Sequence, residues 1–234
     1  MTTPSSVDDR RKLHSGVYVE QSLMTEGSGR LERLIPLMSL PQGAIVADFG
    51  CGPGFTLDLI KSRIGHYYGV DFSEELVRVA RERADAAGIR NATFVASSIA
   101  EFAMAHAAEL DVALAMDVSE HVPDDEWRDA LRSIRRALKP GGVLYLHTPN
   151  ADFFLEMMKE RNFIFRQFPV HIAVRDTADN TALLVDAGFE IRRVDLLPHY
   201  NVLRYLHPLS ALPIVGKYLA ARIFIRAGNP ESVG

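Results

Sequence analysis

The stretch from Val46 to Phe55, which reads VADFGCGPGF, constrains the fold of this chain more than any other feature. An apolar run ending in an acid meets three glycines at alternate positions. A helical pattern follows, with apolar positions at Leu57, Leu59, Ile60 and Ile64. Glycine tolerates positive φ, and the N–H groups at a helix start can bind a ligand that approaches bare backbone. The stretch predicts a strand, a ligand-binding turn and a helix, although an ordinary strand-to-helix turn has the same outline.

A second acid follows at the distance that a nucleoside site requires. Residues 67–71 read YYGVD, a short strand that ends in Asp71. At the carboxyl end of the neighbouring parallel strand, this carboxylate can accept hydrogen bonds from both ribose hydroxyls of an adenosine. Folds that bind NAD and folds that bind S-adenosylmethionine share this arrangement. The dinucleotide pattern G-x-G-x-x-G requires a third glycine where this chain has Phe55, which argues against NAD.

The G-x-G-x-G turn preceded by Asp48 resembles motif I of the class I S-adenosylmethionine-dependent methyltransferases. The stretch 138–145, LKPGGVLY, resembles the turn into the fifth strand of that family. The resemblance implies a Rossmann-like, doubly wound α/β fold, with a seven-stranded, mostly parallel sheet that includes one antiparallel strand. It also implies S-adenosylmethionine as the cofactor and S-adenosylhomocysteine as the product.

The resemblance also implies roles for individual residues at the cofactor site. Asp48, Gly50, Gly52 and Gly54 match motif I and are expected to hold the methionine portion and backbone of the cofactor. Cys51 lies between two motif glycines, and we interpret it as a small packing residue of the cofactor turn rather than a nucleophile.

The adenosine and sulfonium ends of the cofactor have further candidates. Asp71 matches the ribose-binding acid, and Phe72 is placed to lie along the adenine. Ser98 stands where the family usually has an acid that reads the adenine amino group, and Ile99 is a candidate adenine wall. The remaining candidates are Asp117 near the sulfonium and amino group, and Tyr18 in a segment that folds over the cofactor in relatives.

Glu120-His121-Val122 follows the fourth predicted strand, where the family often carries these residue types. Methyl transfer to an oxygen requires removal of a proton, and histidine titrates near neutrality. We therefore predict His121 as the base and Glu120 as the group that orients it or binds the acceptor, while a structural role in capping the next helix stays open. His171 is a further catalytic candidate, and His147 and His199 are rival bases. No tight histidine–carboxylate spacing supports a metal site at Glu120, His121 and His171, so we expect no metal.

Periodicity places strands near 45–49, 66–70, 92–96, 110–116, 142–148, 189–197 and 221–227, and helices from Ser73, from Asp124 and over 177–187. Alternating strands and helices indicate one domain with a mostly parallel sheet. Residues 1–40 are predicted to cover the cofactor. Two aromatic and aliphatic inserts, 150–176 and 198–219, are predicted to form the acceptor wall, because ligands bind beyond the carboxyl ends of parallel strands. The arginines of the helix that begins near Asp124 are predicted to face solvent.

Composition agrees with a globular enzyme and limits its partners. The chain has 234 residues, 47% hydrophobic and 24% charged, with a net charge of −4. A net negative charge does not favour binding to nucleic acid, which is itself negatively charged. The sequence has no signal-peptide core and no apolar run of membrane-spanning length, so we expect a cytoplasmic protein with at most marginal membrane contact. No feature indicates an oligomeric state.

Residues 148–150, TPN, together with the Glu-His-Val motif, resemble the branch that includes ubiquinone-biosynthesis O-methyltransferases and natural-product relatives. The resemblance implies methyl transfer to a small, partly apolar molecule at a hydroxyl oxygen. Nitrogen or carbon acceptors are the chemical alternative, and a dinucleotide-dependent oxidoreductase or a catalytically idle cofactor-binding subunit are the alternatives in other classes. The [DN]-P-P-[YF] signature of base methylation is absent, since the matching strand end reads MDVS.

Overall fold

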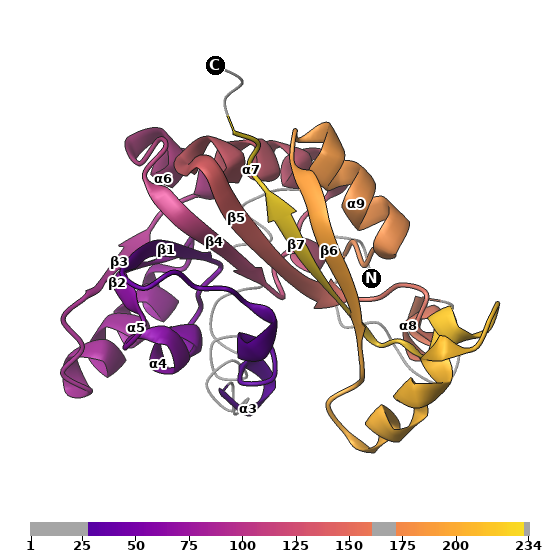
Figure 1. Ribbon diagram of the computed structural model, residues 1–234. Helices are drawn as coiled ribbons and strands as arrows, with labels where there is room; N and C mark the ends of the chain where they lie inside the picture. Colours follow the sequence, from indigo (N-terminus) through magenta and orange to yellow (C-terminus); the bar gives the residue numbers. More distant parts are fainter. Residues whose placement is uncertain (1–27, 161–171, 232–234) are drawn as a thin grey trace.

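Seven strands form one sheet in the computed structural model, which describes residues 28–160 and 172–231 (Figure 1). The strand order is β3-β2-β1-β4-β5-β7-β6, and only β7 runs antiparallel to its neighbours. The predicted fold class is therefore confirmed. The strands are β1 (Ala44–Phe49), β2 (Ile64–Asp71), β3 (Ala92–Ala96), β4 (Leu110–Met116), β5 (Leu138–Pro149), β6 (Glu190–Leu197) and β7 (Arg222–Gly228).

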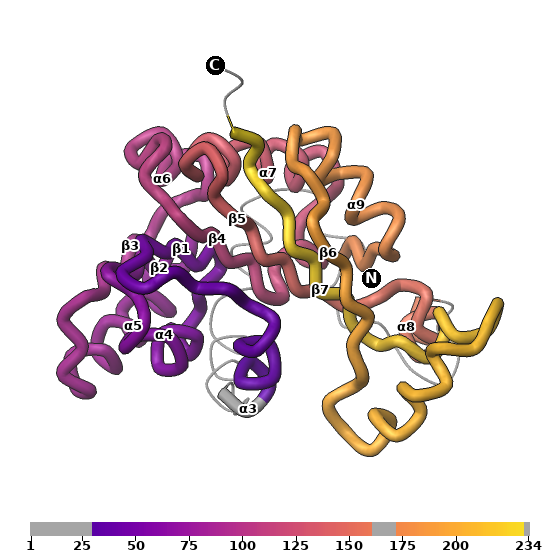
Figure 2. The backbone as a smooth tube through the Cα atoms, in the orientation of Figure 1, coloured from indigo at the N-terminus to yellow at the C-terminus, as the bar shows by residue number. Residues whose placement is uncertain are grey.

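Helices cover both faces of the sheet (Figure 2). One layer contains α3 (Ser28–Leu31), the 3-10 turn η1 (Ile35–Leu37), α4 (Phe55–Ile60) and α5 (Glu74–Ala86). The opposite layer contains α6 (Ile99–Ala105), α7 (Asp124–Ala137) and α9 (Thr177–Asp186). The short elements η2 (Ser119–His121), α8 (Phe154–Glu160), η3 (Val202–Ala211) and η4 (Gly216–Leu219) lie in the connections.

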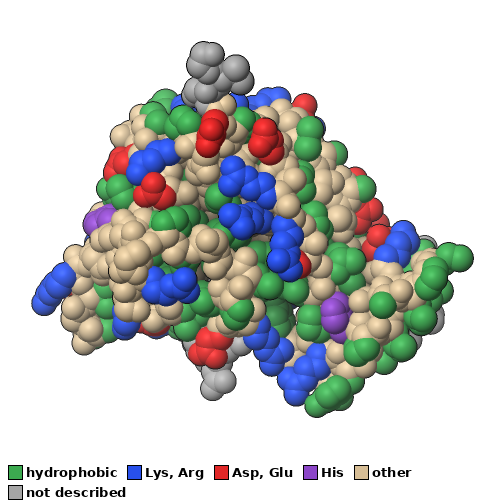
Figure 3. All heavy atoms as spheres, viewed as in Figure 1, with side chains coloured by type: hydrophobic (Ala, Val, Ile, Leu, Met, Phe, Trp, Pro, Cys, Tyr) green, Lys and Arg blue, Asp and Glu red, His purple; other side chains and the backbone are tan. Residues whose placement is uncertain are grey.

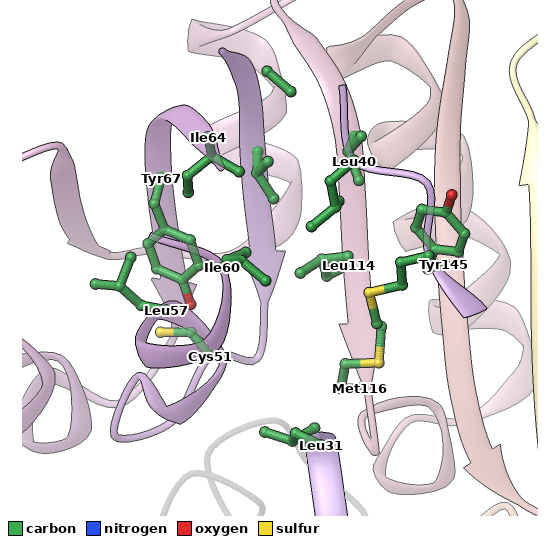
Figure 4. Packing of buried hydrophobic residues seen from close by; sticks show 14 of the residues in the cluster. Leu31, Leu40, Cys51, Leu57, Ile60, Ile64, Tyr67, Leu114, Met116 and Tyr145 are labelled. Atoms are coloured by element: carbon green, nitrogen blue, oxygen red, sulfur yellow. The ribbon is translucent and has the colours of Figure 1, made fainter. Parts of the chain in front are cut away.

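The core strands are buried on both faces, as expected for a parallel sheet between two helical layers. Successive residues of β4 point to opposite sides, so that Leu114 packs toward α4 and α5 whereas Ala113 and Ala115 pack toward α7. Figure 4 shows Leu114 and Met116 of β4 beside Tyr145 of β5 in the first of these layers. The parallel strands β1 to β5 therefore have their carboxyl ends at one edge of the sheet.

The segment 198–219 lies beside α8, so the two predicted inserts meet at that edge (Figure 2). Asn150 joins them by donating a 2.8 Å hydrogen bond to the carbonyl of Ala220, and Lys217 lies 3.0 Å from Asp152. Hydrophobic side chains line the outer rim of the η3 region (Figure 3), where Val202 and Tyr205 are each 70% exposed.

One sequence prediction about α4 is wrong. Ile64 is the first residue of β2, because α4 ends at Ile60 and a turn returns the chain to the sheet. The α7 arginines lie on the outer face of the helix as predicted, and three of them also bind α9 or the turn after it. Arg128 lies 2.8 Å from Asp186, Arg132 lies 3.3 Å from the same carboxylate, and Arg135 donates to the carbonyl of Gly188.

Candidate functional site

The turn after β1 has the backbone shape that its glycines predict. Gly50, Gly52 and Gly54 adopt φ values of +73°, +51° and +77°, a region that other residues enter only with strain. Gly54 precedes the first residue of α4. A Cβ at Gly50 would collide with the side chain of Val118, which follows β4. The turn is therefore packed directly against the end of β4.

Asp71 closes the other side of this turn. Its Oδ2 accepts a 3.0 Å hydrogen bond from the Gly52 amide, and its Oδ1 accepts a 2.9 Å bond from the Ser73 amide. Burial raises the pKa of Asp71, and these backbone donors oppose that effect. Each carboxylate oxygen can accept a second hydrogen bond. The structure thus brings Asp71 and the glycine turn together as the sequence predicts.

Asp48 lies beneath the turn and is 1% exposed. The hydroxyl of Tyr67 donates a 2.8 Å hydrogen bond to it, and Figure 4 shows that ring beside Cys51. Burial raises the pKa of Asp48 to about 6, against the hydrogen bonds from Tyr67 and Thr56. Asp48 therefore braces the turn from below, and its contact with a cofactor stays a prediction. Cys51 is buried and burial raises the pKa of its thiol, which fits a packing residue.

The predicted adenine residues lie at the ends of β2 and β3. Phe72 follows Asp71 and is 41% exposed, whereas Ile99 is half-buried at the start of α6. Ser98 caps that helix: its hydroxyl accepts from the Glu101 amide at 3.2 Å, while the Glu101 carboxylate accepts from the Ser98 amide. This reciprocal capping box explains the serine, and the S-x-x-E spacing at 98–101 was the signal for it. Contacts of these three residues with adenine stay predictions.

Asp117 is the centre of a charged cluster at the end of β4. Its φ is +57°, an uncommon value for a residue other than glycine. Arg222, at the start of β7, donates a 2.9 Å hydrogen bond to Oδ1, and Arg30 of α3 lies 2.9 Å from Oδ2. Burial alone would raise the pKa of Asp117, but His147, Arg222 and Arg30 hold it well below its usual range. Asp117 is therefore an anion held between two guanidinium groups.

His147 joins this cluster from the neighbouring strand. Its Nδ1 lies 2.9 Å from Oδ1 of Asp117, and its Nε2 lies 2.8 Å from the hydroxyl of Tyr200. The Asp117 amide also donates to the His147 carbonyl at 2.8 Å, which fixes the two strand ends together. Arg30 and Arg222 lie over the Tyr200 ring, at 5.5 and 5.1 Å from its centroid. Residues from five separate segments thus converge at this point.

Glu120 lies within η2 and is 1% exposed. The hydroxyl of Thr148 donates to its carboxyl group at 3.3 Å, and Ser119 in turn donates to Thr148 at 2.9 Å. Burial raises the pKa of Glu120 to about 8, and the negative charge of Asp117 adds to the effect. The carboxyl group is therefore mainly protonated at neutral pH.

Arg175 holds η2 in place. Its guanidinium group donates to the carbonyls of Ser119 and Val122, each at 2.7 Å, and to the carboxylate of Asp124 at 2.8 Å. Its side chain is 4% exposed. Arg175 therefore ties the segment before α9 to both ends of the turn that carries Glu120.

The other predicted catalytic and cofactor residues have different outcomes. His121 ends η2 and its side chain is half-buried, so its role as the base stays a prediction. Tyr18 and His171 lie outside the described residues. Among residues 28–160 and 172–231, no group of three or more histidine, cysteine or acidic side chains is placed to hold a metal ion. Within the same ranges, no helix has the length and apolarity to cross a membrane.

Sequence reasoning missed three arginines of this site. Arg222 was visible as a lone charge that begins the apolar strand RIFI, and such a charge needs a buried partner. Arg30 and Arg175 carried no comparable signal, since neither belongs to a predicted strand. Their roles depend on contacts between distant segments that only the fold reveals.

Comparison with known proteins agrees with this geometry. Residues 46–142 match a family model described as a methyltransferase domain. A ubiquinone biosynthesis O-methyltransferase of Aromatoleum aromaticum is 32% identical over 111 residues, which cover 47% of this chain and 46% of that protein. A protein of the same description from Thiobacillus denitrificans is 28% identical over 186 residues, covering 77% and 78% of the two chains. The chain thus matches about half the length of the first relative and more of the second.

A solved structure shares the fold over nearly the whole chain. It is a putative methyltransferase in complex with the Haloferax volcanii Trm112 methyltransferase activator. It superposes with a TM-score of 0.71 at 17% identity, covering 94% of this chain and 98% of that one. The glycine turn, the paired acid Asp71 and the seven-stranded sheet agree with these matches. Residues 46–142 match a methyltransferase domain, and the chain is similar to methyltransferases in sequence and in fold.

Proposed function

We propose that the chain transfers a methyl group from S-adenosylmethionine to a hydroxyl oxygen of a small organic molecule. The observation that carries this proposal is the position of the Asp117–His147–Tyr200 cluster beside the glycine turn, at the same edge of the sheet. An oxygen acceptor needs a proton acceptor close to the transferred methyl group. The names of the curated relatives, which are O-methyltransferases of ubiquinone biosynthesis, support the same chemistry.

The residues of the turn fit this cofactor. A Cβ built on Gly52 meets no heavy atom of the described residues within 4 Å, so a ligand can lie against the bare backbone beside Asp71. We propose that Asp71 binds the ribose hydroxyls and that the glycine turn receives the methionine portion. Phe72 and Ile99 would border the adenine. The bound cofactor supplies a methyl group activated by positive sulfur, and the protein must mainly align the acceptor with it.

We propose that the acceptor lies on the side of α8 and the 198–219 segment, which meet beyond the ends of β4 and β5. Phe153 and His199 stack there with ring centroids 5.9 Å apart, and Tyr200 follows directly. Charged groups are present as well. Burial lowers the pKa of His199, the positive charge of Arg222 adds to this effect, and the negative charge of Glu156 opposes it. The acceptor site therefore combines aromatic surface with polar groups, which suits a small molecule that carries hydroxyls on an apolar body.

Proton removal from the acceptor is assigned among the groups at this edge. Glu120 is mainly protonated below about pH 8, so it binds or orients the acceptor more readily than it accepts a proton. His121 is the base that the sequence predicts, and His147 is its rival from the next strand. A nitrogen acceptor with a free lone pair would need no base, which makes the base a test of the chemical class.

The decisive experiment has two measurements on the full chain. Calorimetry with S-adenosylhomocysteine and with NAD separates a methyltransferase from a dinucleotide-dependent oxidoreductase, and we expect heat only with the former. Release of S-adenosylhomocysteine is then measured with a panel of phenols, alcohols, amines and activated carbon acids. Turnover with hydroxyl acceptors supports the proposal, turnover with amines alone contradicts the oxygen assignment, and binding without turnover on any acceptor supports an idle cofactor-binding subunit.

The same proposal includes where the protein acts and what it meets. We propose a cytoplasmic enzyme whose substrates are small molecules rather than nucleic acid, consistent with the net charge of −4. The exposed apolar rim of η3, with Val202 and Tyr205, favours only weak contact with a lipid surface, because few cations accompany it. Co-sedimentation with anionic vesicles checks this, and strong binding would contradict it.

A further inference from the structure

We propose that Tyr200 and His147, oriented by Asp117, form the relay that takes the proton from the acceptor hydroxyl. This inference rests on the proposed O-methylation and names the groups that perform its proton transfer. The hydroxyl of Tyr200 lies 2.8 Å from Nε2 of His147, and Nδ1 of the same ring lies 2.9 Å from Asp117. The three side chains therefore form a continuous line from the acceptor side into the sheet.

The charge on Asp117 determines the direction of the relay. A carboxylate next to Nδ1 favours the tautomer that carries its proton on that nitrogen. Nε2 then has a lone pair, so the Tyr200 hydroxyl donates to it and keeps its own lone pairs for an incoming hydroxyl. Burial raises the pKa of Tyr200, which keeps the group a neutral hydroxyl. Tyr200 therefore conducts a proton rather than acting as a phenolate.

The protonation state of His147 suits a base. The ring is fully buried, and burial together with Arg222 and Arg30 lowers its pKa, although Asp117 opposes them. The ionisable groups that face it are Asp117 after β4, Arg222 from β7, Arg30 from α3 and Tyr200, while Glu120 of η2 lies near Tyr200 and Asp117. The imidazole is therefore neutral at pH 7, and Asp117 stabilises the imidazolium that forms when it accepts a proton.

The relay also lies between the two halves of the site. Val118 follows Asp117 and packs on Gly50, so the Asp117 end touches the cofactor turn. Tyr200 belongs to the 198–219 segment, which we propose as part of the acceptor wall. In the transfer step, the acceptor oxygen bonds to the methyl carbon. The carbon–sulfur bond breaks at the same time, and the electron pair of that bond returns to sulfur. The acceptor proton passes to Tyr200 while the Tyr200 proton passes to Nε2 of His147, and S-adenosylhomocysteine leaves neutral at sulfur.

One test of the relay needs no acceptor. NMR spectra of labelled histidine ring nitrogens, with His147→Gln identifying the signal, report the tautomer and titration of His147. We expect a proton on Nδ1, a lone pair on Nε2 and a pKa below the ordinary histidine value. A proton on Nε2 in the neutral ring would overturn the relay, because Tyr200 would then accept rather than donate.

The second test compares catechol with 4-nitrocatechol, whose nitro group leaves it ionised at mildly alkaline pH. General-base assistance contributes about 10²–10⁴-fold, so His147→Gln should lower kcat/KM for catechol by that order and remove the acid limb of its pH profile. Tyr200→Phe, a conservative change at a partly buried position, should lower it at least about tenfold. Both variants should methylate the ionised nitrocatechol within a few-fold of the wild type, and both should keep S-adenosylhomocysteine affinity.

Matched controls are His66→Gln and Tyr68→Phe, two changes on β2 that lie outside the site and should leave both acceptors unaffected. Equal losses on both acceptors would overturn the relay, since they would indicate disturbed packing. Loss of the acid limb in His121→Gln, with His147→Gln active, would also overturn it and give the role to His121. If the wild type methylates neither catechol, the proposed O-methylation of phenols fails, and the imidazole titration alone decides the relay.

Discussion

The amide of Gly52 donates a 3.0 Å hydrogen bond to the carboxylate of Asp71, across the space between the ends of β1 and β2. This contact joins the turn that a cofactor would lie against to the acid that would bind its ribose. Because the second oxygen of Asp71 accepts from Ser73, the carboxylate is oriented before any ligand arrives. A site organised in this way loses little conformational entropy on binding.

The first prediction follows from this contact. S-adenosylhomocysteine should raise the thermal unfolding temperature of the wild type, because a ligand that binds only the folded state stabilises it. Asp71→Ala should remove most of this rise, since a hydrogen bond to a charged acceptor is worth about 1.5–3 kcal/mol. Asp85→Asn, on the exposed face of α5, is the control. An unchanged ligand-induced shift in Asp71→Ala would end its assignment as the ribose acid.

The second prediction concerns the space above the turn. Gly52→Ala and Gly43→Ala both place a Cβ where no described residue lies within 4 Å, at positive φ values of +51° and +76°. Each should therefore cost about 1–2 kcal/mol of folding stability. Only Gly52→Ala should also weaken S-adenosylhomocysteine binding, because Gly43 lies before β1, at the opposite edge of the sheet.

Calorimetry on the two variants, together with urea unfolding, separates strain from lost ligand space. Equal affinity in both would mean that the Gly52 turn is only structural. Gly54→Ala would be a poorer test, since its Cβ would lie 3.1 Å from the ring of Phe94 and its effect would begin with packing.

The sequence predicted the central strands of the sheet well because they are largely apolar runs bounded by turns. The strands 92–96 and 110–116 were predicted to the residue, and β7 was predicted one residue early. The β5 strand begins earlier than predicted, at Leu138, because the LKPGG segment itself pairs with β4 through Leu110. Such errors concern element ends, where local signals are weakest.

The candidate site was predictable only where its residues are neighbours in sequence. The turn from Gly50 to Gly54 forms locally, and Asp71 ends the adjacent strand, so both follow from motif and topology. Asp117 and Arg222 are 105 residues apart in the sequence, and nothing in the local sequence of either residue indicates the other as its partner. Ser98 shows the opposite case, in which a residue predicted at the adenine site also forms a local helix cap.

The third prediction is a pH dependence of stability. The pKa of Glu120 is about 8 in the folded protein and near 4.5 when unfolded, so the folded state binds one more proton between these values. Folding stability should therefore fall as pH rises through this window, by up to roughly 1.4 kcal/mol per pH unit from this group. Asp48, with its pKa raised to about 6, adds a smaller effect of the same sign.

Glu120→Gln should remove most of that slope, because glutamine cannot lose a proton. Urea unfolding of the wild type and the variant at pH 5 and pH 8 measures the difference. The variant should resemble the wild type at pH 5 and be more stable at pH 8. If both proteins lose the same free energy of unfolding between pH 5 and pH 8, Glu120 does not titrate in this range. Its hydrogen bonds would then compensate for its burial.

The last prediction concerns Arg175, whose guanidinium group satisfies the carbonyls of Ser119 and Val122 at both ends of η2. Arg175→Met keeps an apolar stem but leaves two inward-facing carbonyls without their donors, and each such loss costs about 1–3 kcal/mol. We expect the free energy of unfolding to fall by about 2–4 kcal/mol. Arg175→Lys should recover only part of this loss of stability. A lysine ammonium lacks the planar fork of a guanidinium group, so it cannot reach both carbonyls and Asp124 at once.

Arg193→Met tests whether the effect is specific to the buried guanidinium. Arg193 pairs with Asp195 on the surface of β6 and is exposed, so its loss should change stability little. Since Arg175 holds the turn that carries Glu120, its methionine variant should also reduce methyl transfer more than it reduces S-adenosylhomocysteine affinity. The glycine turn is held by β1 and β2, and within the described residues Arg175 makes no hydrogen bond to either strand. A variant that loses affinity and turnover in equal proportion would show that η2 supports the cofactor rather than the acceptor.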